Sequence, residues 1–175
     1  AVDGGTLQVD GSISGDQPIW GNGVDSILNM SDTMTVGNSG TGTLTISDGG
    51  TVTVNSGQDS DPGSGTVQVA LSTGSTGTIF FGAEDTDTAP TVGAGKLDAT
   101  GVILGEGTGK LVFNHTDSDY TFNPIISGNG SVEVHAGTTI FNGDQTYTGD
   151  TTIYGGTLRV NGSLTSEITV TGGAL

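Results

Sequence analysis

The sequence predicts an all-β chain wound as a parallel solenoid, and three observations lead to this fold class. Short segments in which apolar and polar residues alternate run through the chain, as in Thr6–Val9 and Thr157–Val160, and a period of two indicates strands with one buried face. Pairs of turn-forming residues, such as Gly-Gly, Asp-Gly and Asn-Gly, separate these segments, while no segment shows a sustained helical period. One segment near the start also recurs near the end, and such repetition is typical of a solenoid.

The alternating segments place the predicted strands and their inward-facing side chains. Every second residue of each segment is apolar, and we expect these residues to line the core. The clearest segments are Thr6–Val9, Thr43–Ile46, Thr51–Val54, Thr66–Val69, Ser131–Val134, Thr157–Val160 and Glu167–Val170. The side chains expected to face inward are Leu7, Val9, Leu44, Ile46, Val52, Val54, Val67, Val69, Ile79, Phe81, Val102, Leu104, Val132, Val134, Leu158, Val160, Ile168 and Val170.

Internal similarity favours the solenoid over the alternative, an antiparallel sandwich built from hairpins. Gly4–Ser12 recurs as Gly155–Ser163, and looser versions occur at Gly42–Ser47 and Gly65–Ala70. With about 20 residues per coil, the chain makes about eight or nine coils. A strand spacing of about 4.8 Å then gives a rod about 40 Å long. Because each coil buries little surface alone, stacking must supply the stability.

The composition favours a slender rod with an aliphatic core. The 175 residues include 33 glycines but only five phenylalanines, one tryptophan and no cysteine. Because large aromatic side chains are so scarce, we expect a narrow column of Val, Ile and Leu. The absence of cysteine excludes disulfides, cysteine nucleophiles and thiolate metal sites, and it is compatible with export.

The charge of the chain excludes two classes of partner. Three residues, Lys96, Lys110 and Arg159, supply all of its Lys and Arg, against 19 acidic residues, which gives a formal net charge of −16. Nucleic acids and anionic membrane surfaces bind clusters of Lys and Arg, so we expect neither as a partner. The chain has no apolar run of about 18 residues, so we expect no membrane-spanning helix. It also has no leader at its start, and we expect a mature internal segment.

Three polar stretches interrupt the strand pattern and are expected to be loops that bulge from the rod. They are Gln58–Gly65, Glu84–Val92 and His115–Tyr120, and all are rich in Asp, Ser, Thr or Pro. Binding commonly resides in loops on a rigid scaffold. Solvated insertions without a partner are the alternative for each of them.

One segment carries a resemblance to a known family. Gln145–Gly162 contains Tyr-Thr-Gly, Thr-Thr-Ile and Gly-Gly-Thr-Leu in that order, and it closely resembles the autotransporter-associated β-strand repeat. Gly4–Ser12 resembles the tail of another copy. The resemblance implies a right-handed, single-stranded parallel β-helix from an autotransporter passenger. We therefore expect residues 1–175 to be one β-helix segment of a longer passenger, with the repeat at 145–162.

The same resemblance implies a function at the bacterial cell surface, or as a protein secreted through the outer membrane. Members of the family are commonly adhesins, self-associating factors of aggregation and biofilm, or other virulence-related proteins. The expected partners are a host-cell surface, the extracellular matrix or the same protein on neighbouring cells, and we also expect end-to-end self-association. A structural stalk for a distal binding domain and a carbohydrate-active β-helix enzyme are the two alternatives.

No catalytic serine is expected. Some autotransporter passengers carry a serine protease with the nucleophile motif Gly-Asp-Ser-Gly-Gly, and the similar string Gly37–Thr41 departs from this motif at two positions. A catalytic triad also requires a histidine beside the serine. We expect both His115 and His135 to be ordinary surface side chains.

Carboxylate chemistry is also not expected, although β-helix lyases and glycosidases use clusters of acidic residues. The candidate clusters are Asp59 with Asp61, the group Glu84, Asp85 and Asp87, and Asp117 with Asp119. All lie in predicted loops, where solvated charge is the usual explanation. Gly21–Ile27 partly matches a calcium-binding repeat, but that motif works only in tandem and no second copy follows. We therefore expect no catalytic residue, no cofactor and no metal site.

Overall fold

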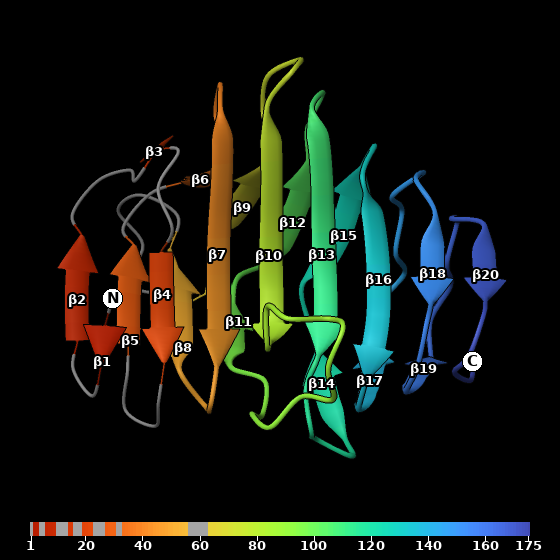
Figure 1. The fold of residues 1–175 in the computed structure, drawn as a ribbon. Helices are drawn as coiled ribbons and strands as arrows, with labels where there is room; N and C mark the ends of the chain where they lie inside the picture. The colour runs from red at the N-terminus through yellow and green to blue at the C-terminus, as the bar shows by residue number, and fades with distance from the viewer. Residues whose placement is uncertain are drawn as a thin grey trace.

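The computed structural model describes residues 33–55 and 63–175 in full, together with the backbone of five strands nearer the N-terminus. The described residues form strands that lie side by side across the molecule (Figure 1). They contain no helix, and therefore none long and apolar enough to cross a bilayer. Some predictions lie wholly or partly outside the described residues. They are the inward-facing side chains of Leu7 and Val9, the pair Asp59 and Asp61, and the string Gly21–Ile27.

The strands form four parallel sheets, numbered 1 to 4. Sheet 1 contains β1 (Val2–Asp3), β4 (Ile19–Asn22), β7 (Thr41–Ser47), β10 (Thr76–Gly82), β13 (Thr108–Asn114), β16 (Ser131–Ala136), β18 (Thr151–Ile153) and β20 (Ile168–Val170). Sheet 2 contains β2 (Thr6–Val9), β5 (Ile27–Met30), β8 (Thr51–Val54) and β11 (Lys96–Asp98). Sheet 3 contains β3 (Ser14–Gly15), β6 (Met34–Val36), β9 (Thr66–Val69), β12 (Gly101–Leu104) and β15 (Ile125–Gly128). Sheet 4 contains β14 (Tyr120–Phe122), β17 (Thr138–Phe141) and β19 (Thr157–Val160).

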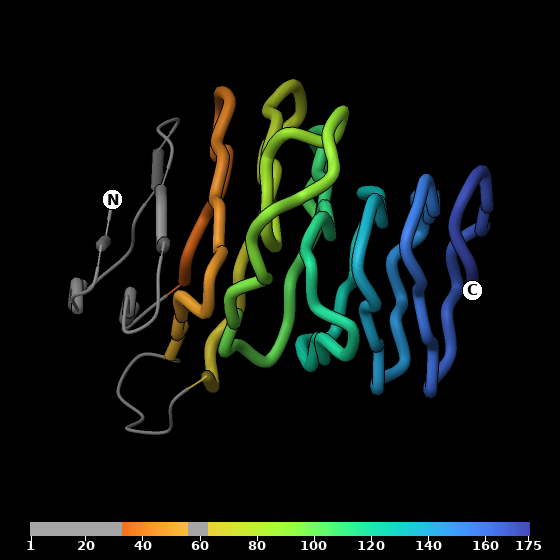
Figure 2. Tube along the Cα trace, turned by 60° about the horizontal axis from the view of Figure 1, so that its bottom comes forward, coloured from red at the N-terminus to blue at the C-terminus, as the bar shows by residue number. Residues whose placement is uncertain are grey.

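The order of the strands within the sheets confirms the predicted parallel solenoid. Each coil begins with a strand of sheet 1 and continues with a strand of sheet 2 or sheet 4. In the first five coils a strand of sheet 3 follows, and the chain then returns to sheet 1 one strand further along. All strand pairs are parallel, and equivalent residues of successive coils lie opposite one another, as Thr43, Thr78 and Lys110 do. Sheet 1 has eight strands, one for each coil, which agrees with the predicted eight or nine coils. Figure 2 shows successive coils of the described residues following one another toward the C-terminal end.

The coils differ in length because loops are inserted between the strands of the central ones. Thr76 pairs with Thr41, which is 35 residues earlier, and with Thr108, which is 32 residues later. Later in the chain the spacing contracts, and Val132 pairs with Thr151, which follows it by 19 residues. The predicted 20 residues per coil therefore hold for the C-terminal coils, and the central coils exceed this length.

Glycines at the corners allow the coils to stack closely. Gly128 has a φ of +94°, and a Cβ there would lie 1.9 Å from the backbone oxygen of Leu104 in the preceding coil. No side chain fits at that distance, and a positive φ is accessible to glycine at little cost. At another corner, Asp48 and Gly49 both have positive φ, and Gly50 donates a hydrogen bond to the Ser47 carbonyl, which is the pattern of a tight two-residue turn.

The core follows the predicted inward-facing positions closely. Most of the described residues that were predicted to face inward are buried. They are Leu44, Ile46, Val52, Val54, Val67, Val69, Ile79, Phe81, Val102, Leu104, Val132, Val134 and Leu158. Val160 and Ile168 pack against this core and are partly buried. Val170 pairs with the buried Ile153 of the preceding coil and so follows the predicted inward-facing column, but its side chain is 48% exposed because β20 is the last strand of sheet 1.

Aromatic rings occupy the middle of the core, which corrects the expectation of a purely aliphatic column. The rings of Phe81 and Phe113 stack with centroids 4.9 Å apart. Phe122 meets both rings edge-on, at 5.1 and 5.3 Å, and Phe141 lies 5.6 Å from Phe113. Four of the five phenylalanines therefore form one cluster that crosses successive coils.

Three buried polar residues connect neighbouring coils within the predicted repeat. Gln145 accepts a hydrogen bond from the Ile126 backbone N–H at 2.7 Å. The hydroxyls of Tyr147 and Thr151 are 2.5 Å apart, and Thr151 also lies 2.5 Å from the Ser166 hydroxyl of the next coil. Buried polar groups of this kind require partners. The tyrosine and threonine of the repeat pattern therefore have a structural role, since they satisfy one another inside the stack.

Candidate functional site

Two of the predicted loops meet on one side of the rod. The segment 83–95, here the β10–β11 loop, connects sheets 1 and 2, and the segment 115–119, here the β13–β14 loop, connects sheets 1 and 4. The backbone N–H of Ala94 donates to a carboxylate oxygen of Asp117 at 2.7 Å, and that of Thr116 donates to the Val92 carbonyl at 3.0 Å. Both segments are loops, as predicted, but they pack against each other instead of extending separately. Tyr120 was included in the second loop and instead begins strand β14.

The β10–β11 loop also reaches back to the preceding coil. The backbone N–H of Asp48 donates to the Gly93 carbonyl at 2.9 Å, and the Gly93 N–H donates to the Asp48 carboxylate at 3.3 Å. Nearer its start, the Glu84 carboxylate accepts a hydrogen bond from the Thr45 hydroxyl. The loop therefore contacts the coil before it and the coil after it, and it is fixed to the rod at several points.

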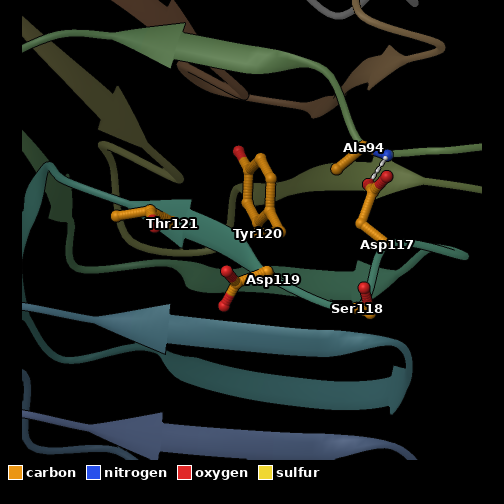
Figure 3. A pocket seen from close by; sticks show the side chains of 6 residues that line it. All are labelled: Ala94, Asp117, Ser118, Asp119, Tyr120 and Thr121. Atoms are coloured by element: carbon orange, nitrogen blue, oxygen red, sulfur yellow. Dashed lines mark hydrogen bonds between the residues drawn. The ribbon is translucent and has the colours of Figure 1, made fainter.

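An open pocket of about 480 Å³ lies where the two loops meet. Its lining residues are Ala94, Asp117, Ser118, Asp119, Tyr120 and Thr121. Figure 3 shows the Tyr120 ring between the Asp117 and Thr121 side chains, with Asp119 below it and the hydrogen bond from Ala94 to Asp117 at one side. The pocket thus combines one aromatic ring with carboxylate and hydroxyl groups.

Tyr120 is held rigidly in this pocket. Its hydroxyl donates a hydrogen bond to the Gly95 carbonyl at 2.8 Å, and its ring lies 6.1 Å from Phe81 and 5.1 Å from the His115 ring. Burial, followed by the nearby charge of Asp117, raises the pKa of the Tyr120 hydroxyl. The hydroxyl therefore stays protonated and remains a hydrogen-bond donor, while the ring provides a fixed wall.

His115 is buried, so the prediction that it is a surface side chain is wrong. Its Nε2 lies 3.0 Å from the Thr139 hydroxyl, and its Nδ1 has no hydrogen-bond partner and lies 3.6 Å from an Asp117 carboxylate oxygen. Burial lowers the pKa of His115 and outweighs the opposite effect of Asp117. The sequence placed it in a polar loop, but the loop folds over it, with Tyr120 against its ring.

The order of Thr139 hydroxyl, His115 imidazole and Asp117 carboxylate resembles that of a hydrolase triad. The Thr139 side chain, however, is fully buried, so no substrate can reach its hydroxyl. A nucleophile must be accessible to the bond that it attacks. This arrangement is therefore a buried hydrogen-bonded group beneath the pocket.

His135 follows the buried Val134 in β16, but its side chain is only 14% exposed and is more covered than predicted for a surface side chain. Its ring stacks on Tyr154 with centroids 4.7 Å apart, and its Nε2 lies 3.1 Å from a Glu133 carboxylate oxygen. Lys110 pairs with Glu133 at 2.6 Å. Burial raises the pKa of Glu133, but the hydrogen bonds from Lys110 and His135 outweigh it and leave this pKa below its ordinary value.

Among the acidic residues singled out in the sequence, Asp85, Asp117 and Asp119 lie in the described part of the chain and are exposed or make local hydrogen bonds. The Asp117 and Asp119 side chains are 42% and 77% exposed, whereas a catalytic general acid requires a carboxyl group in an apolar environment. Asp85 accepts hydrogen bonds from the Asp87 N–H and the Thr88 hydroxyl, which is a local turn. Within residues 33–55 and 63–175, no group of three His, Asp or Glu is placed to hold a metal.

Comparisons with known proteins identify the repeat. The model of the passenger-associated-transport-repeat family matches residues 136–160, a stretch that contains β17, β18 and β19 and overlaps the repeat predicted at 145–162. The match confirms the predicted resemblance to autotransporter passengers.

Two curated relatives come from Escherichia coli K12. "Uncharacterized lipoprotein YdeK" is 37% identical over 119 residues, which cover 65% of this chain and 8% of the relative. "Uncharacterized protein YuaQ" is 36% identical over 56 residues, which cover 30% of this chain and 4% of the relative. The chain thus spans less than a tenth of the curated relatives that it matches. No solved structure matches it significantly.

Proposed function

We propose that the chain is a segment of a secreted or cell-surface autotransporter passenger and that it acts as a scaffold for adhesion or self-association. The observation that carries this proposal is that the matched repeat at 136–160 forms part of a continuous stack of parallel coils. A stack of this kind presents long faces of regularly spaced side chains. The repeat family supports a secreted or surface-exposed location, and the lipoprotein name of one relative is compatible with the cell envelope.

The proposed mechanism is multivalent contact along the rod. Many weak contacts on one elongated surface give a strong total attachment when they act together. The proposed partners are a host-cell surface, the extracellular matrix or the same protein on neighbouring cells. Sheet 1 also ends in β1 and β20, and unpaired strand edges associate readily, so end-to-end association of the isolated segment is part of the proposal.

This function is tested by removing the segment from the passenger. Bacteria that display the complete passenger are compared with bacteria that display a passenger lacking residues 1–175, at equal surface levels. We expect the deletion to reduce clumping in suspension and attachment to cultured cells, because contacts along this part of the rod are lost. A passenger with another stretch of equal length removed is the control. Unchanged clumping and attachment would contradict the proposal and favour a stalk.

A further inference from the structure

The pocket between the β10–β11 and β13–β14 loops has the size of a small-ligand site. Its volume is about 480 Å³, and pockets that bind small molecules usually measure about 300–1,000 Å³. It is a shallow, largely open hollow, and its lining comes from loops that are hydrogen-bonded to each other and to the rod. A ligand of one or two rings fits such a hollow without displacing a strand.

The lining groups match the chemistry of a sugar. A sugar ring has an apolar face of C–H groups and a periphery of hydroxyls, and exposed aromatic rings with nearby polar groups complement both. Tyr120 supplies a half-buried ring that packs against the core, lines the pocket and is fixed by its hydrogen bond to Gly95. Asp117 and Asp119 supply carboxylate acceptors, and carboxylates form stronger hydrogen bonds to hydroxyls than neutral groups do. Ser118 and Thr121 add exposed hydroxyls that both donate and accept.

A buried nitrogen lies directly behind a lining residue of the pocket. The His115 side chain is fully buried, and its Nδ1 faces an Asp117 carboxylate oxygen at 3.6 Å without a hydrogen bond. Buried polar atoms in native proteins nearly always have hydrogen-bond partners, so each exception requires an explanation. This unmet nitrogen therefore lies beside the carboxylate that a bound ligand would contact.

The charge of the pocket disfavours an anionic ligand. The lining residues include two carboxylates and no Lys or Arg, and the net charge of −16 repels anions. Arg159 approaches one side, with its guanidinium 3.8 Å from Asp119. A calcium ion requires six to eight oxygen ligands, whereas no group of three acidic or histidine residues is placed for a metal in the described part of the chain.

From these observations we propose that the pocket binds a neutral saccharide, with the sugar ring against Tyr120 and its hydroxyls hydrogen-bonded to Asp117 and Asp119. The proposal names the class of ligand that the exposed scaffold would contact, and its biological role rests on the proposed surface function. The binding itself is a property of the purified segment.

Saturation-transfer NMR on the purified segment tests this proposal. The probes are cellohexaose and chitohexaose, two neutral oligosaccharides that differ in their N-acetyl groups. We expect irradiation of the aromatic protons to transfer saturation to the C–H face of at least one probe, because that face lies on Tyr120. We also expect the signal to persist with EDTA, since the site requires no metal.

The key variant is Asp119→Ala, because its side chain is 77% exposed and the substitution leaves folding intact. We expect it to weaken binding about tenfold, the effect of one lost hydrogen bond to a charged group. Asp150→Ala removes the same group from an exposed position in another coil, and it should bind like the original chain. A signal from neither probe, a signal abolished by EDTA, or equal binding by Asp119→Ala and Asp150→Ala would each overturn the proposal. Loss of bacterial clumping is a separate result, since a segment can bind sugar without joining cells.

Discussion

Replacing Phe81 with alanine is expected to lower the free energy of unfolding by about 4 kcal/mol, the usual cost of removing a buried phenylalanine ring. Phe81 is fully buried, stacks on Phe113 at 4.9 Å and meets Phe122 edge-on at 5.1 Å. These three residues come from three strands in two successive coils. The substitution therefore leaves a cavity at the centre of the stack, which the neighbouring coils cannot fill without losing their own pairing.

Phe80 provides a matched control for this prediction. It is the same residue type at the preceding position of β10, on the opposite face of the strand, where it pairs with Thr45 and Val112 and is only partly buried. We expect Phe80→Ala to cost about 2 kcal/mol or less, because less apolar surface is lost from the core. Urea titrations followed by circular dichroism measure both values. Similar losses for the two variants would show that Phe81 does not lie inside the stack.

Replacing Gly128 with alanine is expected to be the second large effect. A Cβ at this position would lie 1.9 Å from the Leu104 carbonyl oxygen of the preceding coil, and the φ of +94° strains any other residue. The alanine therefore forces two coils apart, as well as adopting an unfavourable backbone conformation. Overpacking of this kind costs about 2 kcal/mol beyond the backbone strain.

The variant Gly74→Ala separates the cost of backbone strain from the cost of the contact between coils. The φ of Gly74 is +84°, but a Cβ there meets no atom within 4 Å. Gly74→Ala therefore carries only the cost of the left-handed conformation, about 1 kcal/mol. The difference between the two glycine variants, measured by thermal unfolding, reports the contact between coils. If Gly74→Ala were as destabilising as Gly128→Ala, the close approach of Gly128 to Leu104 would be contradicted.

Period-two patterning was sufficient to predict the fold class and most of the core. Segments such as Thr66–Val69 alternate cleanly, and the structure buries Val67 and Val69 as predicted. The pattern fails where a strand does not alternate. Phe113 ends the run Leu111–Val112–Phe113, in which all three residues are buried, so periodicity alone gave no reason to select it for the core.

Tyr147 shows a second kind of residue that patterning misses. It lies outside any strand and is fully buried, with its hydroxyl on Thr151. The family pattern contains this tyrosine, but alternation of apolar residues does not mark it as part of the core. Its burial depends on a polar partner from the same repeat, which becomes visible only when the coil is closed.

The pocket was only partly predictable from the sequence. The loop containing Asp117 and Asp119 was predicted as a polar insertion, because its composition is unsuited to a strand. Ala94 and Thr121 carried no signal, since they line the pocket only after stacking brings two coils together. The burial of His115 also depends on this packing, because a histidine between polar residues has no local feature that predicts a buried position.

The central claim is that equivalent strands of successive coils lie side by side in a parallel register. The chain has no cysteine, so engineered pairs test this claim directly. Thr43 and Thr78 lie opposite each other in β7 and β10, whereas Lys110 lies one strand further, opposite Thr78. Adjacent strands are about 4.8 Å apart, which suits a disulfide, and strands two positions apart are too distant.

We therefore expect Thr43→Cys with Thr78→Cys to form an intramolecular disulfide under mild oxidation, as measured by intact mass and non-reducing electrophoresis. The pair Thr43→Cys with Lys110→Cys should remain reduced under the same conditions. If the second pair cross-links within the chain as readily as the first, or if the first does not cross-link, the parallel stack of coils is contradicted.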